Sequence, residues 1–138
     1  MADTLTPLHV EIITPDGSVY AADGVKMVVA RATDGEFGIM KGHLPLAAAL
    51  EIAPVRIVTE TGETQIAVFG GFLENKDNSV NIIAPLAELA KDIDVARAEA
   101  AKKRAEERLA NKTADLDVER AQSALHRALV RLQIAGKM

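Results

Sequence analysis

The chain has 138 residues, of which 49% are hydrophobic and none is cysteine. This length fits one ordinary domain, or a small domain with an appendage, and the apolar content is sufficient for a core. The lack of cysteine excludes disulfide bonds and thiolate metal sites, as is typical of a chain from a reducing compartment. Residues 1–4 lack a basic, apolar signal pattern, and the longest apolar run, residues 44–50, is far too short to span a bilayer, so we expect a soluble chain.

The net charge of −4 is divided unevenly along the chain. Residues 1–86 hold five Lys/Arg against eleven Asp/Glu, a net charge of −6, whereas residues 87–138 hold eleven against nine, a net charge of +2. A nucleic-acid-binding protein would combine a strong basic excess with aromatic side chains for stacking. All four aromatic residues precede the basic part: Tyr20, Phe37, Phe69 and Phe72. We therefore expect no nucleic-acid partner.

Residues 8–84 have the pattern of short β-strands separated by turns. Apolar residues alternate with polar ones over residues 8–12, and further strands are predicted at residues 18–20, 25–32, 55–59, 65–72 and 80–83. Turn sequences between them include Asp34-Gly35 and Thr61-Gly62. Many short strands at regular spacing predict an antiparallel β-sandwich or barrel with about eight to ten strands.

Two glycine-containing segments interrupt this pattern. Residues 38–46 enclose apolar residues between glycines and a proline, which fits either a surface loop that docks a partner or an irregular connection whose leucines enter the core. Gly70-Gly71 fits a bulge or the close approach of another backbone segment.

After Pro85 the pattern becomes helical. Residues 87–110 contain eight alanines and no glycine or proline, with Asp92 and Asp94 placed to cap a helix. A second helix, capped by Thr113 or Asp115 and ended by Gly136, has apolar residues at spacings of three and four. We expect a helical hairpin over residues 87–138 after a strand domain over residues 1–86. Alanine side chains bury little area, so the hairpin should be weakly packed and able to detach.

Four arginines in the helical part have spacings that allow them to converge on a polyphosphate. Arg97 and Arg104 are seven residues apart and Arg127 and Arg131 are four apart, so each pair lies on one face of its helix. Guanidinium groups bind phosphate oxygens bidentately at any physiological pH. The alternative is an exposed ion pair, since Asp94 precedes Arg97 by three residues.

No catalytic centre is predicted. The chain lacks a phosphate-binding loop with the sequence Gly-x-x-x-x-Gly-Lys-Ser/Thr, and no Ser lies in a nucleophile motif. The three histidines are far apart and lie outside metal-ligand spacings. The sequence therefore predicts neither an enzyme nor a metal site. If Mg²⁺ accompanies a bound nucleotide, no set of protein ligands for it is evident.

Several segments, in the same order along the chain, resemble the epsilon subunit of bacterial rotary ATP synthase. They are Thr14-Pro15-Asp16-Gly17, the stretch from Gly35-Glu36-Phe37 through Gly42-His43-Leu44-Pro45-Leu46, Gly70-Gly71-Phe72-Leu73-Glu74, and Ile93-Asp94-Val95-Ala96-Arg97-Ala98. The resemblance covers essentially the whole chain. It implies a sandwich of about ten strands and a C-terminal antiparallel two-helix hairpin.

The resemblance also implies a role and partners. The sandwich would contact the gamma subunit and the membrane ring of c subunits at the cytoplasmic face of the bacterial membrane. The hairpin would either fold back or extend toward the alpha and beta subunits, where it inhibits ATP hydrolysis. Candidate partner contacts are Glu36, Gly42, His43 and Leu44. The protein would associate with the membrane only as part of that complex.

Some members of this family bind ATP as a regulatory ligand in the folded state. By resemblance, the ATP-binding residues are Glu88, Ile93, Asp94, Arg97, Ala98, Arg104, Arg127 and Arg131. The arginines would contact phosphates or ribose, Glu88 and Asp94 would make polar contacts, and Ile93 and Ala98 would line the adenine pocket. Two other functions fit the arginine cluster: a stand-alone ATP-binding sensor module, and an enzyme that acts on a phosphorylated substrate.

Overall fold

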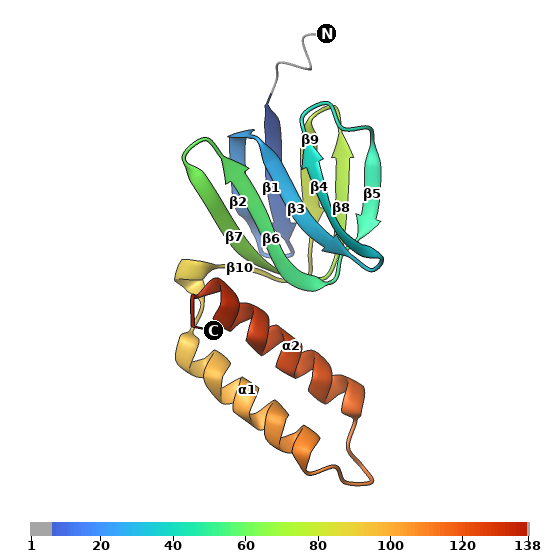
Figure 1. The fold of residues 1–138 in the computed structure, drawn as a ribbon, viewed down its shortest axis with the longest axis vertical. Coiled ribbons are helices and arrows are strands. Elements are labelled where there is room, and N and C mark those ends of the chain that lie inside the picture. Colours follow the sequence, from blue (N-terminus) through green and yellow to red (C-terminus); the bar gives the residue numbers. More distant parts are fainter. Residues whose placement is uncertain (1–6, 138) are drawn as a thin grey trace. The chain divides into compact units, whose positions relative to one another are not determined.

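The structure of the chain is a computed structural model that describes residues 7–137. The chain divides into two compact units between Leu89 and Ala90. The first unit is a sandwich of two five-stranded sheets, and the second is an antiparallel pair of helices (Figure 1). These ten strands and two helices in the described residues confirm the fold that the sequence predicts.

The two sheets have simple strand orders. Sheet A has the order β2 (Gly17–Val25), β1 (Leu8–Thr14), β9 (Ser79–Ile83), β8 (Phe72–Lys76) and β5 (Leu46–Ala49). Sheet B has the order β10 (Ala87–Leu89), β7 (Gly62–Phe69), β6 (Ile52–Thr59), β3 (Met27–Ala32) and β4 (Gly35–Met40). The edge strands β5 and β4 therefore belong to different sheets.

The core lies between the two sheets and consists of branched aliphatic side chains. Strand alternation sends Leu8, Val10 and Ile12 of β1 inward, and all three are fully buried. Ile57 of β6 and Ile66 of β7 face them from the other sheet and are also fully buried. The alternating pattern over residues 8–12 thus predicts the inner face of β1 correctly.

The sequence predicts an entirely antiparallel sandwich, but one pair of the described strands is parallel. Strands β1 and β9 pair in parallel, with Val10 opposite Val80 and Ile12 opposite Ile82. Parallel neighbours require a long crossover connection rather than a hairpin, and here the intervening strands supply it. A pattern of local alternation contains no information on the direction of such a distant partner.

The predicted strand at residues 65–72 is two strands in different sheets. β7 ends at Phe69 and β8 begins at Phe72, and both intervening glycines have positive φ. A Cβ atom at Gly71 would overlap the carbonyl oxygen of Ile83. The predicted close approach of another backbone segment is confirmed at Gly71, where the chain crosses between sheets.

The helical part begins later than the sequence predicts. Ala87–Leu89 forms β10, which pairs with β7, so the sandwich continues three residues past the predicted boundary at Leu86. A 3₁₀ turn, Ala90–Asp92, follows before the first helix. Helix propensity favours an alanine-rich segment, but pairing with an open sheet edge prevails for these three residues.

The hairpin consists of α1 (Val95–Ala110) and α2 (Val118–Ile134). Asp94 caps α1 by accepting a hydrogen bond from the Arg97 N–H, which confirms one of the two predicted caps. Asp117, rather than Thr113 or Asp115, caps α2 by accepting from the Arg120 N–H. Within residues 7–137, neither helix combines the length and the apolar character required to span a membrane.

Candidate functional site

Small side chains dominate the contact between the two helices. The buried residues of α1 are Ala98 and Ala105, seven positions apart on one face. The corresponding face of α2 contains Ala121, Ala128 and Leu132, which are also buried. We call these five residues the seam. Alanines at a seam let two helix backbones approach closely while burying little apolar area.

Each of the four predicted arginines immediately precedes a seam residue. Arg97 precedes Ala98 and Arg104 precedes Ala105, and the same relation holds for Arg127 and Arg131 before Ala128 and Leu132. One residue is a rotation of about 100° around a helix. In an antiparallel pair, equal rotations from the two facing positions reach the same side. The four arginines therefore lie on one side of the hairpin, which we call the arginine flank.

Acidic side chains of α1 lie mainly on the other side. Glu99 and Glu106 each follow a seam alanine and so lie on the flank opposite the arginines. The Asp94 carboxylate accepts the Arg97 backbone N–H at 3.1 Å. Within residues 7–137, no ion pair involves the side chains of Arg97, Arg104 or Arg127. The alternative side-chain pair between Asp94 and Arg97 is thus not formed.

Two further arginines satisfy the same positional rule. Arg120 immediately precedes the seam residue Ala121, and Arg108 precedes the half-buried Leu109, four positions after Ala105. Both are exposed and extend the arginine flank toward the loop that joins the helices. Sequence reasoning missed them because it compared arginine spacings with each other rather than with the apolar face.

The remaining predicted ATP-binding residues have different environments. Glu88 lies on β10 opposite Ala67, in the sandwich unit. Ile93 is half-buried and precedes the α1 cap, and Ala98 is 2% exposed in the seam. The Ala98 side chain is therefore enclosed by protein in this conformation. Within the described residues, no group of three or more His, Asp or Glu side chains is arranged to hold a metal ion.

Gly42, His43 and Leu44, three of the four predicted partner contacts, lie in residues 41–45, which we call the docking loop, whereas Glu36 lies at the other end of β4. This loop joins β4 to β5 and so crosses from sheet B to sheet A. Leu44 is 79% exposed, whereas Ile39 and Leu46 on either side contribute to the core. Glu36 is paired with Arg31 across β3 and β4 at 3.8 Å. The segment thus combines an exposed loop with flanking residues that are buried (Ile39) or half-buried (Leu46) against the core.

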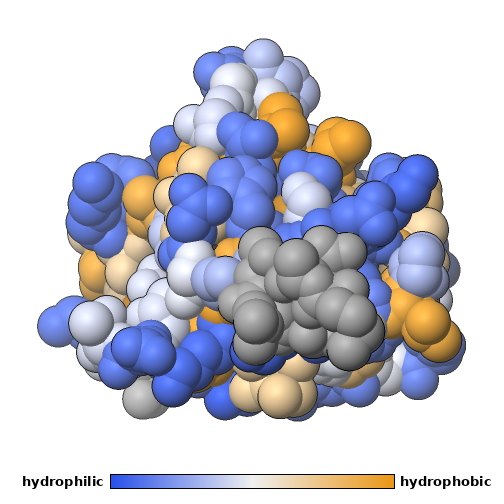
Figure 2. Space-filling model, turned by 90° about the horizontal axis from the view of Figure 1, so that it is seen from above, coloured by the Kyte–Doolittle hydropathy of each residue, from blue (hydrophilic) through white to orange (hydrophobic). Residues whose placement is uncertain are grey.

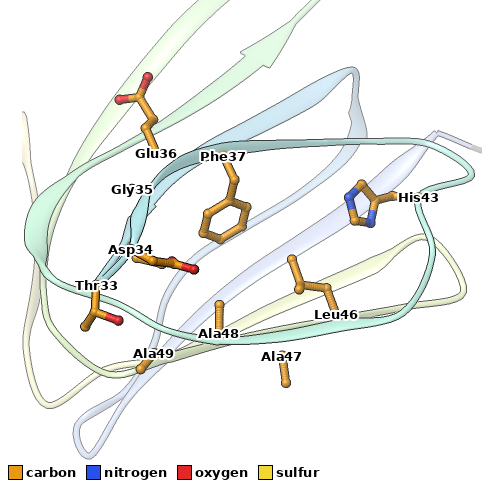
Figure 3. A pocket seen from close by; sticks show the side chains of 11 residues that line it. Thr33, Asp34, Gly35, Glu36, Phe37, His43, Leu46, Ala47, Ala48 and Ala49 are labelled. Atoms are coloured by element: carbon orange, nitrogen blue, oxygen red, sulfur yellow. The ribbon is translucent and has the colours of Figure 1, made fainter.

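A groove of about 620 Å³ runs between the edge strands β4 and β5. Figure 3 shows the rings of Phe37 and His43 facing this space, with Leu46 beside them. Asp34 lies toward the far end, on the β3–β4 turn. The docking loop contributes His43 to the lining and thereby shapes one end of this edge groove.

An apolar row crosses the outer face of sheet A. Phe72 and Ile83 are directly paired on β8 and β9 and are 65% and 59% exposed. Ala49 and Ile13 continue the row on the flanking strands β5 and β1. This row of neighbouring apolar side chains is a candidate protein contact surface. By contrast, Figure 2 shows that, on the molecular face it displays, hydrophobic residues occur in small groups among hydrophilic ones.

Comparison with known families accounts for both units. Residues 7–90 match the family model described as ATP synthase, Delta/Epsilon chain, beta-sandwich domain, and residues 91–136 match its long alpha-helix domain. The ATP synthase epsilon chain of Pelotomaculum thermopropionicum is 54% identical over 129 residues, 94% of this chain and 96% of that protein. The epsilon chain of Bacillus subtilis is 49% identical over 130 residues, 94% and 98% of the two proteins.

Solved structures show the same fold at low sequence identity. A chain from the mitochondrial ATP synthase of Euglena gracilis has a TM-score of 0.78 at 20% identity, covering 93% of this chain and 80% of that one. A chain from the mitochondrial ATP synthase of Tetrahymena thermophila has a TM-score of 0.61 at 16% identity, covering 93% and 96%. With family matches to both units and relatives about half identical along most of its length, this chain belongs to the ATP synthase delta/epsilon family as an epsilon chain.

Proposed function

We propose that this chain is a non-catalytic subunit of the central stalk of a bacterial proton-translocating ATP synthase, with its hairpin acting as an ATP-responsive inhibitor of ATP hydrolysis. The sandwich joins the gamma subunit and the ring of c subunits at the cytoplasmic face of the membrane. The observation that carries the regulatory part is the arginine flank. A row of guanidinium groups contributed by both helices suits the charge of a triphosphate.

Weak packing of the hairpin makes such a ligand effective. A molecule that contacts both helices binds the folded hairpin better than the opened one, so it stabilises the folded form in proportion to that difference in affinity. ATP that bridges Arg97 of α1 and Arg127 of α2 has this property. Without ATP, the hairpin opens and its basic side chains reach acidic surfaces of the alpha and beta subunits, an attraction that salt weakens.

Calorimetric titration of ATP into the full chain tests the ligand. We expect binding without hydrolysis and an affinity that Arg127→Ala reduces by about 10- to 100-fold, the range for loss of a charge-assisted hydrogen bond. Lys103→Ala is the matched control, because Lys103 is an exposed cation of α1 outside the arginine flank. Equal affinities for the two variants would place the ATP site elsewhere.

Removing the hairpin tests inhibition. A chain that ends at Leu89 keeps β10 and hence the complete sandwich. We expect it to assemble with the synthase and to leave ATP hydrolysis uninhibited, whereas the full chain inhibits. Hydrolysis measured on complexes rebuilt with each chain decides the matter. Equal inhibition by both chains would exclude the hairpin as the inhibitor.

The apolar row supports docking of the sandwich on a protein partner. We expect Phe72→Asp to abolish assembly with the gamma subunit while the sandwich remains folded, because Phe72 is 65% exposed. Thr64→Asp, on an exposed position of sheet B, should assemble normally. Co-purification of each variant with the complex measures this, and normal assembly of Phe72→Asp would assign docking to another surface.

A further inference from the structure

Two asparagines of the β8–β9 hairpin hold the docking loop. The Asn78 Oδ1 atom accepts the Gly42 N–H at 2.7 Å. The Asn75 side-chain amide donates to the carbonyl oxygens of Leu44 at 3.2 Å and His43 at 3.4 Å. Three backbone groups of a five-residue loop are thus bound by side chains more than thirty positions away in the sequence.

Stability of the sandwich does not explain Asn75. Its side chain faces the interior from β8, where the residue is 2% exposed, and within the described residues its Oδ1 atom has no hydrogen-bond partner. A buried amide oxygen without a partner is destabilising, and a β-branched apolar residue would suit an inward-facing strand position better. What Asn75 supplies at this position is the donor for the loop carbonyls.

Asn78 is itself rigidly placed. Asp77 and Asn78 have φ values of 51° and 61° and form the two-residue turn between β8 and β9. This turn requires left-handed conformations at both positions, which asparagine adopts more readily than most residues. The Asn78 carbonyl oxygen accepts the His9 N–H at 2.9 Å, which ties the turn to β1. The loop is therefore anchored to the body of sheet A.

The same contacts fix the His43 ring at the end of the edge groove. Its Nδ1 atom lies 2.6 Å from the Leu44 carbonyl oxygen. A carbonyl oxygen only accepts, so Nδ1 carries the proton and Nε2 is the acceptor in the neutral ring. The Asn75 amide nitrogen lies 3.5 Å from Nδ1, but both atoms are donors in this tautomer and form no hydrogen bond with each other. The loop presents the exposed Leu44 beside an imidazole of defined tautomer.

We propose that Asn75 and Asn78 are positioning residues that hold the docking loop in its binding conformation before the partner arrives. The inference rests on the proposed function, because it takes the ring of c subunits as the partner of this loop. A preformed loop loses less conformational entropy on binding than a mobile one, so affinity rises without any additional contact. Neither asparagine needs to touch the partner.

Backbone amide hydrogen exchange in the full chain tests the positioning directly. Asn78→Gly retains a residue that accepts positive φ but removes the acceptor of the Gly42 N–H. We expect the Gly42 amide to exchange at least about tenfold faster, while the Leu50 amide, bonded to the Gly71 carbonyl oxygen at 2.8 Å, is unchanged. Unchanged exchange at Gly42 would overturn the proposed positioning.

Affinity for a detergent-solubilised complex of gamma subunit and c-ring from the same organism tests the consequence. We expect the Asn75→Val variant to unfold at the same or a higher temperature than the unmodified chain and yet to bind about tenfold more weakly. The Asn78→Gly variant should also bind about tenfold more weakly. A merely structural role would couple weaker binding to lower stability. Thr64→Val, an exposed substitution in sheet B, is the control and should leave affinity unchanged.

The outcomes separate this inference from the function on which it rests. Faster exchange at Gly42 with unaltered affinity would overturn the docking role of the positioned loop, while the chain could still join the complex through the apolar row. If the unmodified chain fails to bind the gamma and c-ring complex, the proposed function itself is wrong, and the docking role fails with it.

Discussion

The sandwich core and the seam between the two helices contain side chains of different size, although α2 also buries Val130 and Ile134 outside the seam. The largest fully buried residues are all in the sandwich and are leucine, isoleucine or valine, such as Ile57 and Ile66. The facing seam of the hairpin is alanine except for Leu132. Burial of a branched aliphatic side chain stabilises by about 1.5–3 kcal/mol, whereas a methyl group contributes about 0.8 kcal/mol.

The sandwich core should therefore be more stable than the packing of the two helices against each other. A hairpin whose seam consists mainly of small side chains can be opened or closed by a ligand of ordinary affinity, since a ligand at 100 times its Kd contributes about 2.7 kcal/mol. The same ligand would hardly change the stability of the sandwich. A binding signal can therefore change the hairpin selectively, and the following substitutions test that separation.

The largest effect is expected in the sandwich core. Ile66→Ala removes a fully buried side chain and should lower the free energy of unfolding of the sandwich by about 2–5 kcal/mol. The helical circular dichroism transition should stay at the same denaturant concentration as in the unmodified chain, because the substitution lies in the other unit. Chemical denaturation followed by Tyr20 fluorescence and by ellipticity at 222 nm measures both units. A helical transition that shifts together with the sandwich transition in this variant would contradict the separation.

The crossing between sheets at Gly71 is expected to be nearly as sensitive. In the Gly71→Ala variant, an alanine would have a positive φ of 100° and its Cβ would overlap the Ile83 carbonyl oxygen. Backbone strain alone costs about 1–3 kcal/mol, so the free energy of unfolding should fall by more than this. Gly17→Ala is a matched control, because Gly17 has a φ of 113° and no heavy atom within 4 Å of the added Cβ. Similar unfolding midpoints for the two variants would show that the close approach is unimportant.

In the hairpin, a larger seam residue should separate the helices. Ala128→Leu places three additional carbon atoms at a position that is 0% exposed and should destabilise the hairpin by about 1–3 kcal/mol. The sandwich transition should remain at the same denaturant concentration. Faster exchange of helical amides in α1 and α2, with unchanged exchange in β1, is the expected signature. A shifted sandwich transition would show that the two units unfold together.

Loss of one helix cap should have a smaller effect. Asp117→Ala removes the acceptor of the Arg120 N–H and should weaken α2 by about 1 kcal/mol, whereas Asp117→Asn retains an acceptor and should lose less. Helical content at increasing temperature measures the difference. If the alanine and asparagine variants lose equal helicity, charge near the helix terminus rather than the capping hydrogen bond is the cause.

The smallest effect concerns pH. Hydrogen bonds from Gln65 and then Arg56 lower the pKa of the Glu63 carboxyl group in the folded sandwich. A lowered folded-state pKa gives stability that is present above the unfolded value, about 4.3, and is lost as the pH falls through the folded value. Glu63→Gln should therefore reduce the acid dependence of sandwich stability below about pH 4. An identical pH profile for the variant would exclude this contribution.

The hairpin has a counterpart to this carboxylate in its connecting loop. A hydrogen bond from the Thr113 hydroxyl lowers the pKa of Asp115. Asp115→Asn should consequently alter the acid response of the helical signal and leave that of the sandwich unchanged. If Asp115→Asn changed the acid response of the sandwich, or Glu63→Gln that of the helical signal, the two units would not be independent.

Sequence patterns predicted the elements whose signals are local. Alternation at Leu8, Val10 and Ile12 identified an inner face, because one strand contains the entire pattern. The three-residue strand β10 was missed because an alanine-rich segment has the composition of a helix, and only the open edge beside β7 decides otherwise. Asp117 was missed among several possible caps because the true helix start depends on tertiary packing.

The candidate site shows the same division. Spacing alone predicted that Arg97 and Arg104 share one face of the first helix and that Arg127 and Arg131 share one face of the second. Placing both pairs on one flank required knowledge of which residues form the seam. The roles of Asn75 and Asn78 could not be predicted, because their partners in the docking loop are 31 to 36 positions distant along the chain.

The path of the docking loop has a mechanical consequence. The loop leaves sheet B at Met40 and enters sheet A at Leu46, and Asn78 ties it to the turn beside β1. A sideways pull on Leu44 is therefore divided between the edge strands of both sheets. Moving either end of the loop requires an edge strand to move against a close-packed core. A load applied to this loop is therefore passed to both sheets of the sandwich.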